Sequence, residues 1–183
     1  MITLKKSLIL SLAIIALACG VILPAVVANG VDMNESQLSL IRNSCSSAKA
    51  TLNQLHTSDA LLRVNRGQVY ESMSTKLMDK FNFQVESSNF IDTQLVDSTN
   101  SYKTLLDKFR ADYILYEEQL SLAISIDCSK QPVSFYDAVA LARTERLQVH
   151  TDVIELNKAM SQYQTSLNQF EINFQTNIQG LKK

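Results

Sequence analysis

The sequence contains little of what a β-rich domain requires. Its 183 residues include only four glycines, two prolines and no tryptophan. Between residues 31 and 179 the single glycine is Gly67 and the single proline is Pro132. A β-rich domain of this size needs many turn residues, so their absence excludes that class. The body of the chain is therefore predicted to be all-α and built from long helices.

Charge and chemical motifs are also sparse. The formal net charge is −1 and no basic tract is present, which argues against a nucleic-acid partner. The chain has no glycine-rich phosphate loop and no HExxH, GxSxG or CxxC motif. Helical rise separates the levels of His56 and His150 by about 13 Å, too far for one shared metal ion. We therefore expect no catalytic residue, no metal and no cofactor.

A long apolar run occupies residues 7–28 and follows Lys5 and Lys6. Positive charge followed by such a run is typical of an export signal. The run is long enough to cross a bilayer as a helix, whereas the small residues before Ala28 resemble a cleavage region. Two interpretations stay open. Residues 1–28 either anchor the protein in the cell membrane with its C-terminal part outside, or they are removed and the remainder is secreted.

Apolar residues then recur at alternating steps of three and four, the spacing of narrow helical seams. One series begins at Leu38, passes through Cys45, Asp59, Leu62, Val69 and Leu77, and loses its heptad spacing near its end. A second series is unbroken and comprises Leu95, Thr99, Tyr102, Leu106, Phe109, Tyr113, Tyr116, Leu120 and Ala123. A third runs from Val139 to Phe174 with Arg146 as its polar member.

Capping residues set the expected helix bounds. After a linker over residues 29–33, we predict an exported bundle over 34–183 with helices at 34–86, 90–125 and 134–179. The expected N-terminal caps are Asn34 with Gln37, Asn89 with Asp92, and Ser134 with Asp137, and the expected stop is Gly180. Short connections make consecutive helices antiparallel neighbours, which predicts a long three-helix coiled-coil-like bundle after the N-terminal helix.

Two of the three cysteines are predicted to form a disulfide. Folding the first two helices against each other places Cys128 level with residue 49, about 6 Å of helical rise from Cys45. Because an exported chain meets an oxidising environment, we expect a Cys45–Cys128 bond that holds the second loop onto the first helix. Two buried thiols remain the alternative for a reducing compartment.

The same register predicts a structural ion pair. Arg146 lies level with residue 61 of the first helix, beside Asp59, and both occupy seam positions. A partly buried pair of this kind fixes register more than it stabilises the fold. The alternative is that both side chains extend to solvent. Tyr102, Tyr113, Tyr116 and Tyr163 also lie on seams, where core packing is favoured and a ligand pocket is the second possibility.

Three stretches resemble a known kind of protein. The segment around Cys45, "SDALLRVNRGQVYESMSTKLMDKFN" (58–82) and "IDCSKQPVSFYDAVALARTERLQVHTDV" (126–153) are similar to N-terminally anchored helical exported proteins of small-genome bacteria. The resemblance implies a membrane anchor and a helical, coiled-coil body. It implies no activity and no site residues.

Two functions follow as hypotheses. The first is an exported or membrane-anchored structural or interaction module without catalytic activity, which binds the membrane through its N-terminal helix and a protein partner or a second copy through its seams. The alternative is an extracytoplasmic sensory or small-ligand-binding bundle that works with a separate membrane partner.

Overall fold

The computed structural model describes residues 32–90 and 92–181, and their regular structure is entirely helical. Helix α1 spans Glu35–Ser72 and continues through a π-helix, η1 (Met73–Met78), into α2 (Asp79–Ser87). Helix α3 spans Thr93–Ser125 and α4 spans Pro132–Leu181. The all-α prediction is thus confirmed. The predicted membrane or signal helix over residues 1–28 lies outside the described residues. Within the part that the structure describes, no helix is long and apolar enough to cross a membrane.

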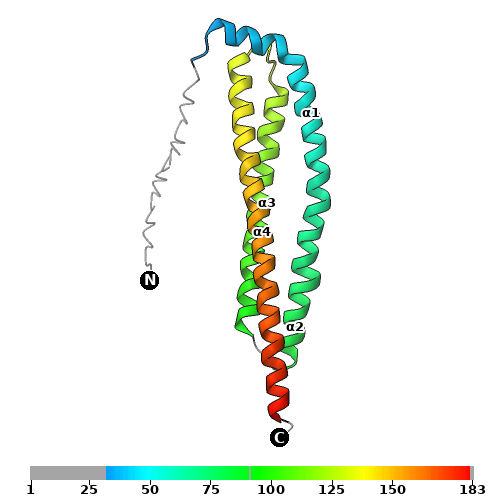
Figure 1. Ribbon diagram of the computed structural model, residues 1–183. Helices are drawn as coiled ribbons and strands as arrows, with labels where there is room; N and C mark the ends of the chain where they lie inside the picture. Colours follow the sequence, from blue (N-terminus) through cyan, green and yellow to red (C-terminus); the bar gives the residue numbers. More distant parts are fainter. Residues whose placement is uncertain (1–31, 91, 182–183) are drawn as a thin grey trace, which may run out of the picture.

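The molecule is a long bundle of three helical rods (Figure 1). Helices α3 and α4 are antiparallel and share the most extensive contact. The first turns of α1 cross the end of the bundle where α3 connects to α4, and the helix then bends and descends alongside that pair (Figure 1). The C-terminal part of α4 extends past the α2–α3 turn. The α1–η1–α2 rod is therefore the outer layer of the bundle, packed on an α3–α4 hairpin.

The seam predicted for α3 is confirmed residue by residue. Every member of the series from Leu95 to Ala123 is buried. The heptad spacing holds because α3 packs against α4 along its length, as in a regular coiled-coil interface. In α4 the buried set includes Ala142, Leu156 and Tyr163 from the predicted series, whereas Arg146 is exposed.

The seam predicted for α1 is only partly right in its second half, where Met73 and Phe81 of the series pack against the core. Leu62, Val69 and Leu77 are 51%, 57% and 45% exposed, and the buried residues are Tyr70, Ser74, Met78 and Val85. Asp59 and Tyr70 both face inward and are eleven residues, or three helical turns, apart. This gives about 3.67 residues per turn, the period of a nearly straight helix and not the 3.5 of a coiled coil. The following π turn, marked by the Asp79 N–H donating to the Ser74 carbonyl, widens the steps to four residues.

Two of the predicted helix starts also need correction. Asn34 and Gln37 form the expected capping box of α1. Asn89, however, lies in the α2–α3 turn with a φ of 57°, and Asp92 caps α3 by accepting from the Leu95 N–H at 3.1 Å. Helix α4 begins at Pro132 rather than at Ser134, since proline suits the first helical turn, where its missing N–H is not needed. It also continues past the predicted stop at Gly180 to Leu181.

A disulfide closes the end of the bundle that α1 crosses. Cys45 and Cys128 are bonded, with their Cα atoms 5.5 Å apart, and Cys128 is fully buried. Nearby, the Lys49 ammonium donates to the Ile126 carbonyl at 3.2 Å. The bend of α1 lies in this serine-rich region, where Ser47 and Thr51 donate to carbonyls of the preceding turn, a pattern that bends helices. The predicted cysteine pair thus holds the crossing part of α1 onto the α3–α4 loop.

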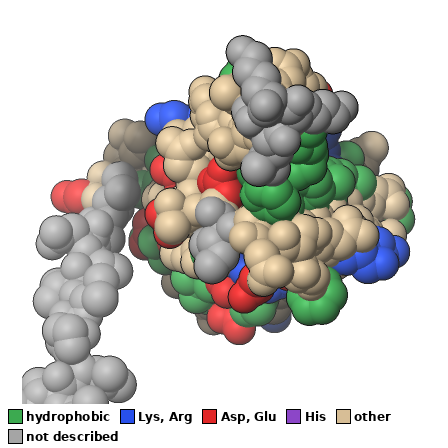
Figure 2. All heavy atoms as spheres, turned by 90° about the horizontal axis from the view of Figure 1, so that it is seen from below, with side chains coloured by type: hydrophobic (Ala, Val, Ile, Leu, Met, Phe, Trp, Pro, Cys, Tyr) green, Lys and Arg blue, Asp and Glu red, His purple; other side chains and the backbone are tan. Residues whose placement is uncertain are grey.

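Aromatic pairs pack the opposite end. Phe81 contacts Phe170 edge to face, with ring centroids 5.7 Å apart, and Phe90 contacts Phe174 at 5.0 Å. Seen from this end, hydrophobic side chains lie open between polar ones (Figure 2). The two ends of the α1–η1–α2 rod are therefore fixed to the hairpin, one by the disulfide and one by aromatic packing.

Candidate functional site

A cavity of about 560 Å³ lies between the middle of α1 and the α3–α4 hairpin. It falls between the disulfide-closed end and the aromatic end of the bundle. Helix α3 contributes aromatic side chains to its lining, whereas α1 and α4 contribute both arginines and aliphatic side chains. A second, smaller hollow of about 290 Å³ lies between α1 and the start of α4, lined among others by Thr51 and Phe135.

Helix α3 supplies an aromatic floor. Phe109, Tyr113 and Tyr116 follow one another on its buried seam and line the cavity. The Tyr113 and Tyr116 rings meet edge to face at 5.9 Å, and Phe109 lies 6.4 Å from Tyr113. Val149 and Val153 of α4 extend this apolar surface. The floor is consequently rigid, because its rings belong to the core of the α3–α4 interface.

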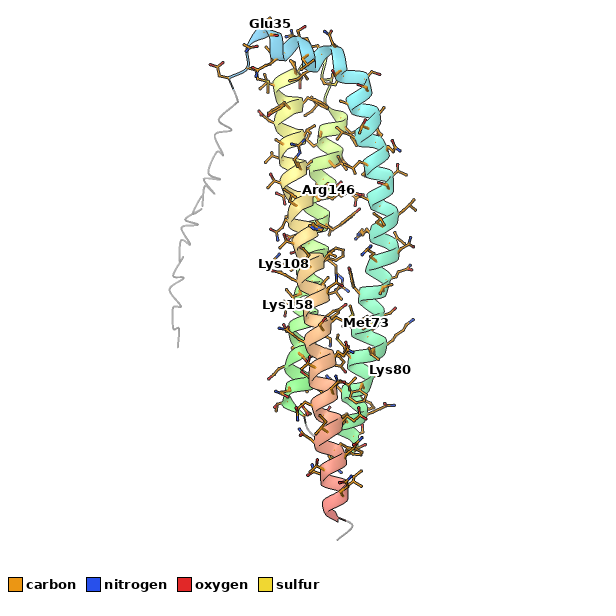
Figure 3. All side chains as sticks on the ribbon, viewed as in Figure 1. Glu35, Met73, Lys80, Lys108, Arg146 and Lys158 are labelled. Atoms are coloured by element: carbon orange, nitrogen blue, oxygen red, sulfur yellow. A yellow bond between two sulfur atoms is a disulfide. The ribbon has the colours of Figure 1, made fainter. Side chains whose placement is uncertain are left out.

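The predicted ion pair lies at one edge of the cavity. The Arg146 guanidinium donates to both carboxylate oxygens of Asp59, Nε to Oδ2 at 2.7 Å and Nη2 to Oδ1 at 3.2 Å. The Tyr116 hydroxyl donates to the same Oδ2 at 2.7 Å. Figure 3 marks Arg146 on the side of α4 that faces α1. One carboxylate of α1 is therefore tied to both α3 and α4.

These contacts fix the protonation state of the group. Burial by itself would raise the pKa of Asp59, but the hydrogen bonds from Arg146 and Tyr116 outweigh it and lower that pKa below its usual value. The bond to Asp59 also raises the pKa of Arg146, while burial and then Asp59 raise the pKa of the Tyr116 hydroxyl. At neutral pH the site thus holds an ionised Asp59 whose charge Arg146 already balances.

Three further arginines line the cavity: Arg63 and Arg66 of α1, and Arg143 of α4. The other arginines of the chain pair with carboxylates, Arg42 with Glu35, Arg110 with Glu71 and Asp107, and Arg146 with Asp59. Within residues 32–90 and 92–181, no ion pair involves Arg63, Arg66 or Arg143. The Arg63 guanidinium lies over the Tyr113 ring, 4.8 Å from its centroid.

The cavity is consequently positive over an apolar floor. Four arginines and one aspartate give its lining a formal charge of +3, on a chain whose overall charge is −1. Such a combination suits the binding of a ligand with a negative group and an apolar body.

The histidines lie in different places. His150 of α4 lines the cavity, and His56 of α1 contacts Glu117 of α3 at 3.3 Å outside it. No group of three or more histidine, cysteine, aspartate or glutamate side chains is arranged to hold a metal ion in the described part of the chain. Of the four seam tyrosines, Tyr113 and Tyr116 reach the cavity, whereas Tyr102 and Tyr163 belong to the core below it.

The arginines of this site, apart from Arg146, were not among the residues predicted from the sequence. They occur as "RVNR" at 63–66 and "RTER" at 143–146, two arginines three residues apart in each case. That spacing puts both members of a pair on one side of a helix. The repeated R-x-x-R pattern was the available signal. The register between the first and third helices placed residues 143–146 level with residues 58–61, about 7.5 Å of helical rise from the pair at 63–66.

A buried charge in α4 was likewise not predicted from the sequence. Asp152 of α4 is only 1% exposed, accepts hydrogen bonds from Lys108 of α3 and from Gln148 at 3.1 Å, and leaves Oδ2 without a partner among the described residues. Burial raises the pKa of Asp152 even though the bond from Lys108 opposes that change. Lys108 also contacts Asp112 at 3.2 Å. This cluster lies within the α3–α4 interface and outside the cavity lining.

Comparison with known proteins identifies no relative: no family model, curated protein or solved structure matches the chain. The resemblance to anchored helical exported proteins therefore stays a prediction. Any function has to be argued from the cavity and the bundle themselves.

Proposed function

We propose that the protein is a non-enzymatic binding module that holds a small organic ligand between α1, α3 and α4. The observation that carries this proposal is the cavity of about 560 Å³, whose apolar floor is bordered by a few convergent polar groups. Small-molecule sites typically have volumes of about 300–1,000 Å³ and this kind of lining. Its position between helices of a bundle is also a common place for a ligand.

The polar groups of the cavity favour binding over catalysis. Asp59 is held by Arg146 and Tyr116, and its lowered pKa makes it a poor proton donor or acceptor near neutral pH. No hydrogen bond in the described ranges connects His150 to a serine, cysteine or carboxylate that it would activate. Arginines remain charged throughout and act in recognition.

We place this module outside the cytoplasm. Lys5 and Lys6 with the apolar run at 7–28 support export, either with a retained anchor or after cleavage near Ala28. The Cys45–Cys128 bond supports the same assignment, because disulfides persist in oxidising compartments. A ligand signal would then pass to a separate membrane partner.

A role as a structural or interaction module is the second candidate. The observation that favours it is a set of exposed aliphatic side chains on α1, Leu61, Val64 and Val69. Exposed apolar residues on one helix are typical of surfaces that meet another protein or a second copy. Sedimentation of the full chain as a strict monomer, with no partner captured by crosslinking in the cell envelope, would count against this role.

The binding proposal is tested by a thermal-shift screen on the full, disulfide-bonded chain in detergent. The variant Leu147→Trp enlarges a side chain that lines the cavity, and Leu141→Trp is the matched control, a similarly exposed leucine of α4 outside it. We expect compounds that raise the Tm of the wild type and of Leu141→Trp but not that of Leu147→Trp. A screen without any stabilising compound, or equal stabilisation of both variants, would contradict the proposal.

A further inference from the structure

We infer that the cavity selects organic anions, in particular compounds with one carboxylate, sulfonate or phosphate group on an aromatic body. This inference rests on the proposed function and specifies its ligand class. It goes beyond the presence of a cavity because it depends on how charge is distributed around it.

Three of the four arginines that line the cavity are available to bind an anion. Arg146 is already balanced by Asp59, through two hydrogen bonds. Arg63, Arg66 and Arg143 make no ion pair within the described ranges, and all three line this cavity. Arginines elsewhere in the structure pair with carboxylates. Gathering like charges without a counter-ion is unfavourable, so a bound anion would relieve repulsion that the unliganded site retains.

These three arginines come from two different helices. Arg63 and Arg66 belong to α1 and Arg143 belongs to α4, and all three line the cavity. An anionic group at the rim can therefore accept hydrogen bonds from two different helices. The planar guanidinium fork matches the two oxygens of a carboxylate and the oxygens of a phosphate or sulfonate. Such a ligand would join the outer rod to the hairpin at the level where neither the disulfide nor the aromatic end holds it.

The apolar part of the cavity would hold the body of the ligand. Phe109, Tyr113 and Tyr116 are 5%, 4% and 2% exposed, so their rings support the floor from below. The apolar surface that a ligand can reach comes mainly from Leu62 and Leu147, which line the same cavity and are 51% and 62% exposed. A flat apolar ring would bury this aliphatic surface, and an acid group at the rim would satisfy both parts of the site at once. Inorganic anions leave the floor uncovered and are expected to bind weakly.

The test uses three probes with the same ring and different charge: 2-naphthoate, 2-naphthalenemethanol and 2-naphthylmethylamine. Each is titrated by calorimetry into the full, disulfide-bonded chain in detergent at low salt. We expect 2-naphthoate to bind at least about tenfold more tightly than the alcohol, since hydrogen bonds between charged partners contribute about 1.5–3 kcal/mol. The amine should not bind measurably, and added salt should weaken naphthoate binding because the arginines are exposed.

Variants locate the site. The double substitution Arg66→Gln with Arg143→Gln should weaken naphthoate binding about tenfold or more and leave the alcohol unchanged. The matched control is Arg42→Gln, which removes an exposed arginine at the far end of α1 that pairs with Glu35. It should bind naphthoate like the wild type. Circular dichroism of each variant checks that the helices remain folded.

The outcomes separate the two proposals. Equal binding of the acid and the alcohol, lost in Leu147→Trp, would overturn the anion class and leave the binding module standing. Naphthoate binding that survives the double arginine substitution would place the anion elsewhere and would also overturn the inference. No binding of any of the three probes, together with a thermal-shift screen without hits, would overturn both.

Discussion

Arg146 of α4 reaches across the bundle and holds the Asp59 carboxylate of α1 with two hydrogen bonds, 87 positions apart in the sequence. Asp59 is 11% exposed and Arg146 51%, so the carboxylate is the buried partner. The pair joins the outer rod to the hairpin at the cavity edge, where Tyr116 adds a third bond. Its strength therefore bears on both the stability of the bundle and the shape of the site.

Replacing Asp59 with Asn should lower the free energy of unfolding by about 1–3 kcal/mol at pH 7, because Arg146 and Tyr116 lose a charged acceptor. The pKa of Asp59 is lowered in the folded state, so its contribution is present above the unfolded pKa of about 4 and is lost as the pH falls through the folded value. Urea unfolding of both proteins from pH 7 to pH 3 measures this. The difference should shrink in acid.

Asp107→Asn is the control for that experiment. Asp107 is an exposed carboxylate that pairs with Arg110 within one helix, and such pairs contribute about 0–1 kcal/mol. A difference between wild type and Asp59→Asn that is absent at pH 7, or that grows toward pH 3, would show that the fork does not stabilise the fold.

Removing the disulfide should destabilise the chain and loosen one end. The double variant Cys45→Ala with Cys128→Ala frees a bond that spans 83 positions. Closing a loop of that length contributes about 2–5 kcal/mol. Urea unfolding measures the loss, and hydrogen exchange should rise in the part of α1 that crosses the bundle end more than in α3. Wild type treated with a reductant should behave like the variant. Alkylation of both cysteines in native, unreduced protein would contradict the bond.

Removing Lys108 should leave Asp152 as a buried charge without its cation. Lys108→Met is expected to cost about 1–3 kcal/mol at pH 7, less than a fully buried pair because Lys108 is partly exposed. Burial already raises the pKa of Asp152, so its folded state binds a proton more tightly than its unfolded state. Part of the loss should therefore be recovered as the pH is lowered from 7 toward about 4.

The matched control is Lys103→Met, which breaks an exposed pair with Asp79 at 2.7 Å. We expect a change of about 0–1 kcal/mol and no recovery in acid. Thermal unfolding of the three proteins over this pH range provides the comparison. Identical pH profiles for both lysine variants would mean that Asp152 is not the group that responds.

Replacing Gly67 with Ala should stabilise the bundle. Gly67 lies within α1, and a Cβ added to it meets no atom within 4 Å. Alanine in a helix interior is about 0.5–1 kcal/mol more favourable than glycine, and here it meets no steric cost. Chemical denaturation should show a gain of that size with an unchanged slope. A destabilised Gly67→Ala variant would indicate that α1 needs flexibility at this position.

Much of the fold followed from local pattern. The lack of turn residues predicted long helices, and an unbroken heptad predicted the buried face of α3 residue by residue. Antiparallel register alone brought Cys45 near Cys128 and Asp59 near Arg146, because helical rise is constant and the connections are short. The structure brings both pairs together.

The remaining features depend on contacts between elements. Sequence spacing showed that the first series loses its heptad near its end, but it did not show which residues of α1 would be buried instead. Tyr70 is buried in place of Val69, because the phase of α1 depends on its contacts with the hairpin. Nor did Asp152 stand out beside the α4 seam, since its cation comes from α3.

The sequence by itself determined three long helices, the seam of α3 and the pairing of distant residues by register, because periodicity and rise are properties of each helix alone. The tertiary structure decided the bend of α1, its π turn and the cavity that it encloses. That cavity takes its floor from one helix and its arginines from two others. Such a site forms only when each helix has its final rotation about its own axis. That rotation depends on contacts between the helices, so no single stretch of sequence encodes it.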